Sequence, residues 1–296
     1  MSTAFVTGAS GFIGGALTKR LVAEGWSVKA LVRSEKSAKV VRALGADPIK
    51  GDLDDVSAMT AGAAGADVAF HSAAHLGEWG NAADFERVNV TGTANAVQAA
   101  RDAGVPRFVF VSTTSAHADA RSYYGQSKFR LEGTLEPSRD LVVRPGLVVS
   151  RRGGLFQRMA GGRAGSSWVV PLFDGGTQPM QTIFVDDLCE GVVRAIERDA
   201  HGSLVLASPE RMTVREFFAA VAAFGKRTPR FVDVPAGLAL AMLRTAEMLR
   251  IPLPVSSENL LGMLSLRYWD AEPDLARLDL RVRPLGETLA ALGRPI

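Results

Sequence analysis

The chain has 296 residues, of which 47% are hydrophobic and 22% are charged. That length allows one large domain with a sizeable core and a second, smaller one. The formal net charge of +3 is too small to indicate a nucleic-acid partner. The single cysteine, Cys189, excludes an intrachain disulfide, and the start of the chain lacks the basic segment of a secretion signal, so we expect a cytoplasmic location.

The start of the chain predicts a strand, a glycine-rich turn and a helix. Residues 3–7 are an apolar run typical of a buried strand, and apolar residues recur at helical spacing from residue 16. Between them, Gly8 permits a tight turn, Gly11 lets the backbone approach a pyrophosphate, and Gly14 lets the helix lie against the strand. This order predicts dinucleotide binding, and a purely structural turn is the alternative.

A second strand is predicted over residues 27–32, and in dinucleotide-binding folds the end of this strand lies beside the adenosine ribose. A site that prefers NAD usually carries Asp or Glu there, whereas this chain has Val32 followed by Arg33. A guanidinium suits a 2′-phosphate because its fork of donors matches the phosphate oxygens. We therefore expect NADP to be preferred over NAD. A solvated cation at a strand end is the alternative.

Two further strands end in residues that suit a bound nucleotide. The strand near residues 49–50 is followed by Asp52, which could accept a hydrogen bond from adenine or cap the next helix. The strand over 68–74 ends in small residues, which leave room for a cofactor to cross the sheet edge. We interpret His71 in this strand as structural rather than catalytic. The loop that follows supplies two candidates to line a substrate pocket, His75 and Trp79.

A fifth strand over residues 108–111 is wholly apolar and is therefore expected inside the sheet. Hydroxyl side chains follow it at residues 112–115, at the carboxyl end where ligands bind in open α/β sheets. A helix is expected to open at Tyr123, and a sixth strand at Leu141. Farther along, we expect an extended segment over 182–185, a helix capped by Asp186, and one more strand over 204–207.

The C-terminal part of the chain is predicted to be mainly helical. Residues 151–176 are rich in Gly and Arg and have little periodicity, which is typical of loops over a site. Residues 237–254 are rich in Leu, Ala and Met, but Arg244, Glu247 and Arg250 make this segment too charged to span a bilayer. We expect an amphipathic helix packed on the core. Peripheral membrane contact is the alternative.

Tyr124 and Lys128 are the residues that could carry chemistry, because side chains four apart share one face of a helix. A phenol titrates near pH ~10. A neighbouring ammonium favours the phenolate, so that the tyrosine can exchange a proton with a substrate oxygen while a nicotinamide moves a hydride. Thr113, at the end of the neighbouring strand, could hold the same oxygen. The pair alone is a weak signal, but it follows a nucleotide-binding pattern and a hydroxyl-tipped strand.

The chain resembles the extended short-chain dehydrogenases/reductases, the NAD(P)-dependent epimerase/dehydratase family. The residues that carry this resemblance follow one another in order at 7–14, 51–53, 71–74, 89–93, 124–128, 144–146 and 184–187. Within the family, the strand ending at Val32-Arg33 and the loop that includes Trp79 look most like the dihydroflavonol-4-reductase-like and 3β-hydroxysteroid-dehydrogenase-like branches. Those branches handle ketones and secondary alcohols of apolar substrates.

The resemblance implies a role for each matching residue. Tyr124 would be the acid/base, Lys128 its electrostatic partner and a ribose ligand, and Thr113 the substrate-binding hydroxyl. The resemblance also implies a homodimer through the helices that carry Asn89 and Tyr124, and a substrate side lined by His75, Trp79 and Ser115. Metal ligands are not expected. The implied cofactor-binding residues are Gly8, Ser10, Gly11, Phe12, Ile13, Gly14, Arg33, Lys36, Asp52, Leu53, Ser72, Ala73, Ala74, Asn89, Tyr124, Lys128, Pro145, Gly146, Leu147 and Val148.

The expected fold is α/β: a Rossmann-like, doubly wound parallel sheet with a smaller, mainly helical C-terminal substrate lobe. We expect the nucleotide-binding domain to span residues 1–168, with 180–207 returning to it, and the substrate lobe to comprise 169–179 and 208–296. The expected function is an oxidoreductase that uses NADP, or NAD, on a carbonyl/alcohol pair of an apolar small molecule. The alternatives are a nucleotide-sugar epimerase or dehydratase with tightly bound NAD, and a non-catalytic NADP sensor.

Overall fold

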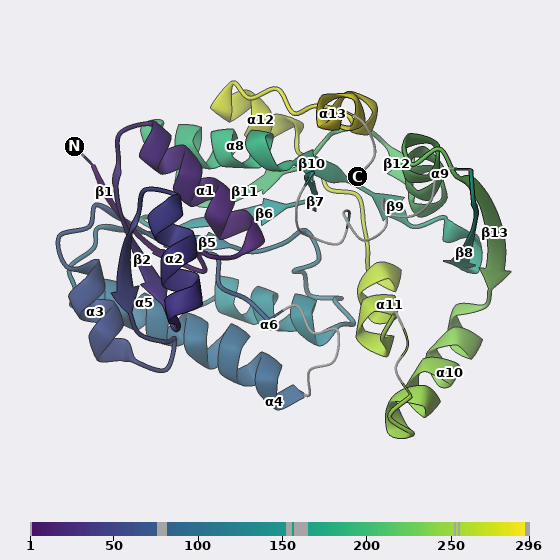
Figure 1. Cartoon of the computed structure of the whole chain (residues 1–296), viewed down its shortest axis with the longest axis horizontal. Coiled ribbons are helices and arrows are strands. Elements are labelled where there is room, and N and C mark those ends of the chain that lie inside the picture. The colour runs from purple at the N-terminus through teal and green to yellow at the C-terminus, as the bar shows by residue number, and fades with distance from the viewer. Residues whose placement is uncertain are drawn as a thin grey trace.

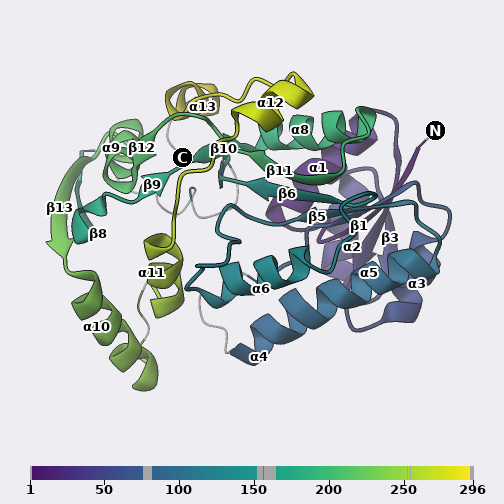
Figure 2. The same ribbon diagram turned by 180° about the vertical axis from the view of Figure 1, so that it is seen from behind.

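The computed structural model describes residues 2–75, 82–151, 156, 165–251, 253 and 255–293. A seven-stranded parallel sheet forms its centre, with the strand order β11-β6-β5-β4-β1-β2-β3. Helices cover both faces of this sheet (Figures 1 and 2). The expected doubly wound α/β fold is confirmed. The strands are β1 (Thr3–Thr7), β2 (Ser27–Val32), β3 (Asp47–Lys50), β4 (Val68–His71), β5 (Arg107–Val111), β6 (Leu141–Pro145) and β11 (Gly202–Leu206).

The two faces of the sheet are covered by two separate sets of helices. One face packs against α1 (Phe12–Ala23), α2 (Glu35–Ala43) and α8 (Val185–Glu197). The other packs against α3 (Val56–Ala63), α5 (Gly92–Asp102) and α6 (Tyr123–Glu132). Successive residues of a strand therefore face opposite sides of the sheet and pack in different hydrophobic cores. In β1, Val6 packs in one core and Phe5 in the other. Strands buried on both faces need continuous apolar runs, which explains why the sequence predicted them well.

A smaller lobe lies beyond the sheet edge (Figure 1). In it, β8 (Ser167–Phe173) pairs in parallel with β13 (Thr228–Val234). The edge strand β11 belongs to the large sheet. The remaining elements are β7 (Leu147–Val149), β10 (Thr182–Phe184), β9 (Pro179–Met180), β12 (Met212–Thr213), the 3₁₀ turn Asp174–Gly176, α9 (Val214–Phe224), α10 (Ala236–Met248), α11 (Ser257–Leu264), α12 (Glu272–Leu278) and α13 (Leu285–Leu292).

The expected cap Asp186 is wrong, and of the two alternatives for Asp52 the structure excludes the helix cap. Asp186 lies inside the first turn of α8, whose N-cap is Phe184, because β10 runs directly into the helix. Asp52 does not cap α3: Asp55 does, by accepting a hydrogen bond from the N–H of Ala58 at 2.9 Å. The carboxylate of Asp52 instead accepts from the N–H of Leu53 at 2.7 Å. Sequence alone could not decide which aspartate caps the helix, because Asp52 and Asp55 are only three residues apart.

The stretch around Val88 contains a π-helical turn. The short helix α4 (Ala82–Phe85) leads into a π-helical segment, Glu86–Thr91, which continues as α5. π-helical turns are rare, and they are often found at functional sites. Apolar periodicity cannot distinguish this wider turn from an α-helical one.

His71 is a buried structural side chain, in agreement with the interpretation from sequence. Its Nδ1 lies 2.7 Å from the hydroxyl of Thr7, and its Nε2 lies 2.9 Å from that of Thr93. The ring stacks on Phe108 and Phe110. Burial, together with the nearby Lys128 ammonium, lowers the pKa of His71 from 6.5 to about 3, so the folded protein holds this ring neutral.

Acid should therefore destabilise the fold through His71. The unfolded chain protonates this ring below its usual pKa, whereas the folded chain does not, so the stabilisation is present above pH ~6.5 and is lost as pH falls toward ~3. Between neutral pH and pH ~5 we expect a loss of about 2 kcal/mol in the free energy of unfolding. Urea unfolding at the two pH values measures it. His71→Gln should lose less than the wild type on acidification, whereas the partly exposed control His201→Gln should follow the wild type. Equal pH dependence in all three proteins would contradict this account.

Candidate active site

The predicted site residues converge on the carboxyl edge of the sheet. The turn after β1 carries the glycines, β2 is followed by Arg33, and β3 is followed by Asp52 and Leu53. On the other side of β1, the small residues follow β4, the hydroxyl cluster follows β5, and the stretch 145–148 follows β6. The strand order reverses between β1 and β4, and doubly wound sheets bind their ligands at this point.

The glycine turn forms a tight cradle between β1 and β4. Gly8 has a left-handed backbone with a φ of +76°, and a Cβ there would lie 2.6 Å from the backbone nitrogen of Ala73. A Cβ on Gly14 would overlap the carbonyl oxygen of Gly8 and the hydroxyl of Ser72. Ser72 also donates to the carbonyl of Thr7 at 2.8 Å, which ties the two strand ends together.

This cradle fits the pyrophosphate of a dinucleotide. The N–H of Gly11 donates to the carbonyl of Gly8 at 2.8 Å, and helix α1 begins directly afterwards with Gly11 as its N-cap. A glycine has no side chain with which to cap the first N–H groups, so a phosphate can approach them closely. Ser10 and Gly11 are exposed at this helix N-terminus, and Phe12 and Ile13 are half-buried.

At the ribose end of the cradle, Arg33 and Lys36 are exposed at the start of α2. Ser34 caps this helix by accepting from the N–H of Ser37 at 3.2 Å, so both cations project from a fixed turn. Leu53, which is buried, packs beneath the same edge, and its carbonyl accepts from the amide of Asn95 at 2.9 Å. The two cations therefore lie at the edge where a ribose phosphate would be bound.

Asn89 holds the chain that leaves β4. Its buried amide accepts from the N–H of His75 at 2.7 Å and donates to the carbonyl of the same residue at 2.9 Å. The π-helical turn places Asn89 for this double hydrogen bond, which fixes the path of Ala73 and Ala74. The ring of His75 meets Phe85 edge-on, with 5.1 Å between centroids. Trp79, the other predicted pocket residue, lies outside the described residues.

The hydroxyl cluster and helix α6 hold the three candidate catalytic residues. Thr113 is half-buried, and its hydroxyl accepts from the N–H of Ser115 at 3.1 Å. Tyr124 lies in the first turn of α6, which Ser122 caps by accepting from the N–H of Gly125. A Cβ on Gly125 would lie 2.5 Å from the carbonyl oxygen of Ser115, so the helix start is pressed against this loop.

Lys128 is buried, with a relative exposure of 1%. Its ammonium donates to the carbonyl of Val111 at 2.9 Å and lies 4.4 Å from the centroid of the Phe110 ring. Burial lowers its pKa to about 7, and the nearby carboxylate of Glu132 opposes this shift. Burial also raises the pKa of Tyr124 to about 12. Burial is the cause of this rise, and it outweighs the lowering of the tyrosine pKa that was expected from Lys128.

A network behind Lys128 was missed by the sequence analysis. Glu132, one helical turn farther along α6, accepts from the hydroxyl of Ser112 and from the guanidinium of Arg144, whose Nε lies 3.1 Å from each carboxylate oxygen. Arg144 in turn stacks on Trp269, whose indole N–H donates to the carbonyl of Thr114 at 2.8 Å. The spacing of Tyr124, Lys128 and Glu132, four residues apart each time, was the available signal.

The smaller lobe closes the rim of this site. The ring Nε2 of His117 donates to the carbonyl of Ser265 at 2.9 Å, and the N–H of Arg121 donates to the hydroxyl of the same serine at 3.0 Å. The N–H of Tyr123 donates to the carboxylate of Glu258 on α11. Helix α11 and the turn after it thus cover the short loop between Ser115 and Tyr123. Of the stretch 151–176 predicted to form loops over the site, residues 152–155 and 157–164 lie outside the described residues. The expectation of loops is wrong for Ser167–Phe173, which form strand β8 because they pair with β13.

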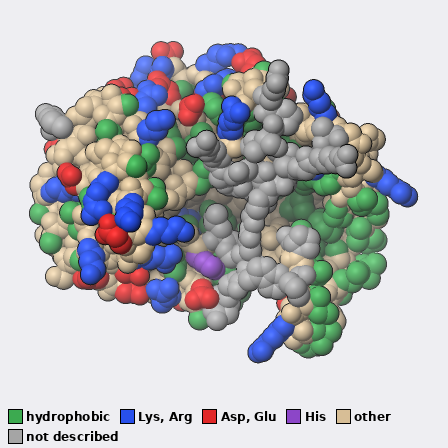
Figure 3. Space-filling model, viewed as in Figure 1, with side chains coloured by type: hydrophobic (Ala, Val, Ile, Leu, Met, Phe, Trp, Pro, Cys, Tyr) green, Lys and Arg blue, Asp and Glu red, His purple; other side chains and the backbone are tan. Residues whose placement is uncertain are grey.

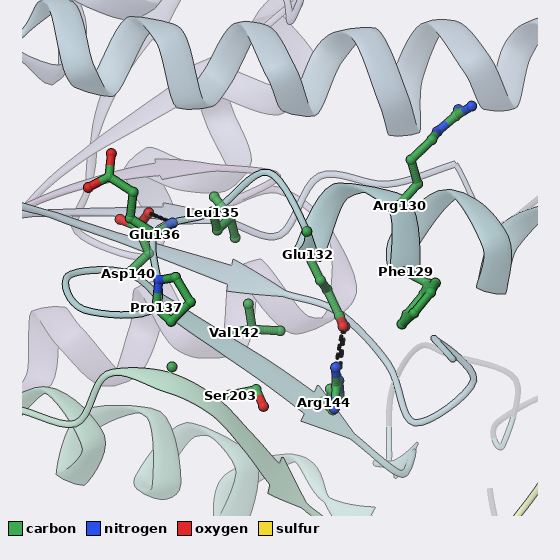
Figure 4. Close-up of a pocket in the computed structure, with 12 residues that line it drawn as sticks. Phe129, Arg130, Glu132, Leu135, Glu136, Pro137, Asp140, Val142, Arg144 and Ser203 are labelled. Carbon is green, nitrogen blue, oxygen red and sulfur yellow. Dashed lines mark hydrogen bonds and ion pairs between the residues drawn. The ribbon is translucent and has the colours of Figure 1, made fainter. Parts of the chain in front are cut away.

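A separate surface hollow of about 460 Å³ lies between α6, β6 and β11 (Figure 4). The close-up shows the Glu132–Arg144 ion pair at one end and Glu136 and Pro137 toward the other. None of Thr113, Tyr124 and Lys128 lines this hollow, so it is distinct from the candidate site. Within the described part of the chain, no cluster of three or more His, Cys, Asp or Glu side chains is arranged to hold a metal ion. No described helix is long and apolar enough to cross a bilayer.

Comparison with known proteins identifies relatives of this chain. A sequence model of the "NAD dependent epimerase/dehydratase family" matches residues 4–207. The chain is 37% identical over 224 residues to the 4-hydroxy-2-methyl-3-oxo-4-farnesyl-3,4-dihydroquinoline-1-oxide ketoreductase of Stigmatella aurantiaca, across 68% of this chain and 66% of that one. It is 31% identical over 239 residues to the ceramide reductase of Caulobacter vibrioides, across 78% and 73%. The alignment thus spans just under two thirds of the first of these relatives.

Solved structures confirm the fold. The chain superposes with a TM-score of 0.72 on the UDP-glucose 4-epimerase from Bifidobacterium longum, a crystal structure in complex with NAD+ and UDP. The match covers 98% of this chain and 96% of the epimerase, at 19% sequence identity. At this identity the likeness establishes the shared fold and nothing about the substrate.

The close approach at Gly14 leads to a stability prediction. Gly14→Ala should lower the free energy of unfolding by about 1–3 kcal/mol, because the new methyl group overlaps the backbone of Gly8, which cannot move away cheaply. Thermal melting of the protein without added nucleotide measures this loss. The matched control is Gly237→Ala in α10, where a Cβ meets no atom within 4 Å. It should leave the melting temperature unchanged or raise it slightly. Equal melting temperatures for Gly14→Ala and the wild type would contradict the tight cradle.

Proposed function

Because the chain belongs to the NAD dependent epimerase/dehydratase family, we propose that it is an oxidoreductase that transfers a hydride between NADP(H) and a carbonyl or secondary alcohol of an apolar small molecule. The observation that carries this proposal is the position of Tyr124 and Lys128 on the helix that follows β5, at the same sheet edge as the glycine cradle. The names of two relatives, a ketoreductase and a ceramide reductase, support the reaction class and an apolar substrate.

The cofactor would lie across the carboxyl edge of the sheet. The pyrophosphate would bind the loop from Gly8 to Gly14 and the N-terminus of α1, and the 2′-phosphate would bind Arg33 and Lys36. Adenine would lie at Asp52 and Leu53. The nicotinamide half would lie along three groups of residues: Ser72, Ala73 and Ala74 after β4; Pro145, Gly146, Leu147 and Val148 after β6; and Tyr124 and Lys128 on α6. When bound, the nicotinamide supplies or accepts the hydride.

The protein's own residues would move the proton. In the reductive direction, the phenol of Tyr124 gives its proton to the substrate oxygen as the carbonyl carbon gains a hydride, which yields an alcohol and a tyrosinate. The hydroxyl of Thr113 holds the same oxygen. The raised pKa of Tyr124 keeps the phenol protonated at neutral pH, which is the form that reduction requires. Lys128 then lies one helical turn away to stabilise the tyrosinate.

A nucleotide-sugar epimerase is the second candidate function, because the family to which the chain belongs is named for its epimerases and dehydratases. Two observations weigh against it: Val32-Arg33 replaces the acid expected for NAD, and the ketoreductase relatives are more similar in sequence. Retention of NAD through purification, with no oxidation of added NADPH by ketones, would favour the epimerase. A non-catalytic sensor would bind NADPH and turn over neither substrate class.

Replacing the acid/base tests the proposed chemistry. Tyr124→Phe should lower kcat for NADPH-dependent ketone reduction by about 10²–10⁴, because it removes the proton donor while keeping the ring. The thermal shift produced by NADPH should stay close to that of the wild type. Tyr123→Phe is the matched control, since Tyr123 is 49% exposed on the same helix turn. Wild-type turnover in Tyr124→Phe would remove Tyr124 from the mechanism.

Replacing the basic residue after β2 tests cofactor choice. Arg33→Asp should weaken NADPH binding by about 10- to 100-fold, because a charge-assisted contact to the 2′-phosphate becomes a repulsion. NADH binding should change little. Lys39→Asp, on the exposed side of the same helix, makes the same change of charge as a control. Thermal shift titrations with both nucleotides measure the difference, and an equal loss for NADPH and NADH would rule out recognition of the 2′-phosphate.

We also propose that the chain forms a homodimer through the helices that carry Asn89 and Tyr124. Two aromatic side chains of α6, Tyr123 and Phe129, are 49% and 41% exposed, which leaves apolar surface for a partner helix.

A further inference from the structure

Helix α10 is apolar on both of its faces, yet only one face is covered. Its only charged residues are Arg244 and Glu247. The inner face, which includes Ala236 and Ala239, packs in a small cluster with Phe173. A helix that is hydrophobic all round is normally buried on all sides. The inner face packs on the protein, as expected for an amphipathic helix. The outer face, which should then be polar, is apolar as well.

The outer face of α10 carries a stripe of large apolar side chains, which the exposed Thr245 interrupts. Leu238, Met242 and Leu249 are spaced i, i+4 and i+11, so they lie on one side of the helix, and they are 56%, 60% and 60% exposed. Met248 and Ile251 extend the stripe at its C-terminal end. These five residues are half of the ten exposed large hydrophobics among the described residues, so the exposure is concentrated rather than scattered.

The neighbouring surface has the same character. Val169 and Val232, on the paired strands β8 and β13 that lead into α10, are also exposed. Figure 3 shows hydrophobic side chains gathered on the side of the molecule where Figure 1 places β13 and α10. Both ribbon views place α10 at the extremity of the smaller lobe (Figures 1 and 2). The apolar face is therefore on a protruding part of the protein.

The charges beside this face are basic. Arg244 and Arg250 are exposed at its edge and its C-terminal end, and Arg230 is exposed on β13. The acids nearby are hydrogen-bonded or paired: Glu247 accepts from the N–H and the hydroxyl of Ser257 at 2.6 and 2.7 Å, and Asp233 is paired with Arg215. Glu258 of α11 accepts from the N–H of Tyr123, and it also lies near Arg244. The apolar stripe is thus flanked by cations, which is the composition of helices that lie in the interface of an anionic bilayer.

We propose that the outer face of α10 is a docking surface for an anionic lipid bilayer, with the helix lying in the plane of the interface and Arg244 and Arg250 at the headgroups. A bilayer accepts a protruding apolar helix without a complementary groove. A second copy of the chain is the alternative occupant, and light scattering distinguishes it from a bilayer.

Docking would also orient the candidate active site. Helix α10 packs against α11 in the cluster that contains Leu240 and Leu260, and Ser265 after α11 is bonded to His117 at the rim of the site. Through α11, the rim would then be connected to the helix that lies at the membrane surface, where an apolar carbonyl compound is concentrated. This consequence rests on the proposed function. The docking itself does not, and its test uses no turnover.

Co-sedimentation of the full-length protein with lipid vesicles tests the proposal. The wild type should pellet with vesicles of phosphatidylcholine that contain phosphatidylglycerol, and much less with phosphatidylcholine alone. Met242→Glu should lower the bound fraction on the anionic vesicles by about tenfold or more, because it places a charge in the buried stripe. Arg244→Gln should weaken binding and reduce its dependence on salt. Val40→Glu, at an apolar residue that is 42% exposed on α2, adds the same charge elsewhere and should bind as the wild type does.

Three results would overturn the proposal. The first is that the wild type fails to pellet with either kind of vesicle. The second is that Met242→Glu, confirmed as folded by an unchanged thermal melt, pellets as the wild type does. The third comes from light scattering after size exclusion: if Met242→Glu dissociates a wild-type oligomer and Val40→Glu does not, a second copy of the chain covers this face instead of a lipid surface.

Discussion

The contact between the turn after β1 and the turn after β4 is the constraint on which the rest of the site depends. Gly8 lies against the backbone of Ala73, and Gly14 lies against Gly8 and the hydroxyl of Ser72. Because neither glycine has a Cβ, the two turns approach more closely than a larger residue at either position would allow. This approach brings the N-terminus of α1 to the point where the strand order reverses. The opening left there is bounded by backbone N–H groups and small side chains, which is why it suits a pyrophosphate.

The second constraint is the buried charge of Lys128. An ammonium with 1% exposure is costly, and the structure offsets that cost with the carbonyl of Val111, the face of Phe110 and the carboxylate of Glu132 nearby. Glu132 is itself held by Ser112 and Arg144. Because breaking a buried pair leaves an unpaired charge, this network fixes α6 against β5 and β6 and so fixes the positions of both Tyr124 and Lys128.

The elements that the sequence predicted best are those set by local pattern. Strands buried on both faces read as apolar runs, and the span of β2 was predicted to the residue. The failures have longer-range causes. The double hydrogen bond between the amide of Asn89 and the backbone of His75, which is 14 residues away in sequence, was not predicted. Trp269 contacts Thr114, and Ser265 contacts His117. These pairs are far apart in sequence, and hydrophobic periodicity, which is a local pattern, cannot predict that they meet. The outer face of α10 was misread because apolar residues predict burial and cannot show that nothing packs against them.

The central claim is that this sheet edge transfers hydride from NADPH to a carbonyl carbon. The most direct measurement is mass spectrometry of the product after the protein is incubated with NADPH deuterated at the transferring position of the nicotinamide and a panel of alkyl ketones. The account predicts an alcohol with one deuterium on the carbinol carbon. The contrary result would be a protein that binds the nucleotide but gives no deuterated alcohol from any ketone. Retention of NAD and inversion of a nucleotide sugar would then show the epimerase function instead.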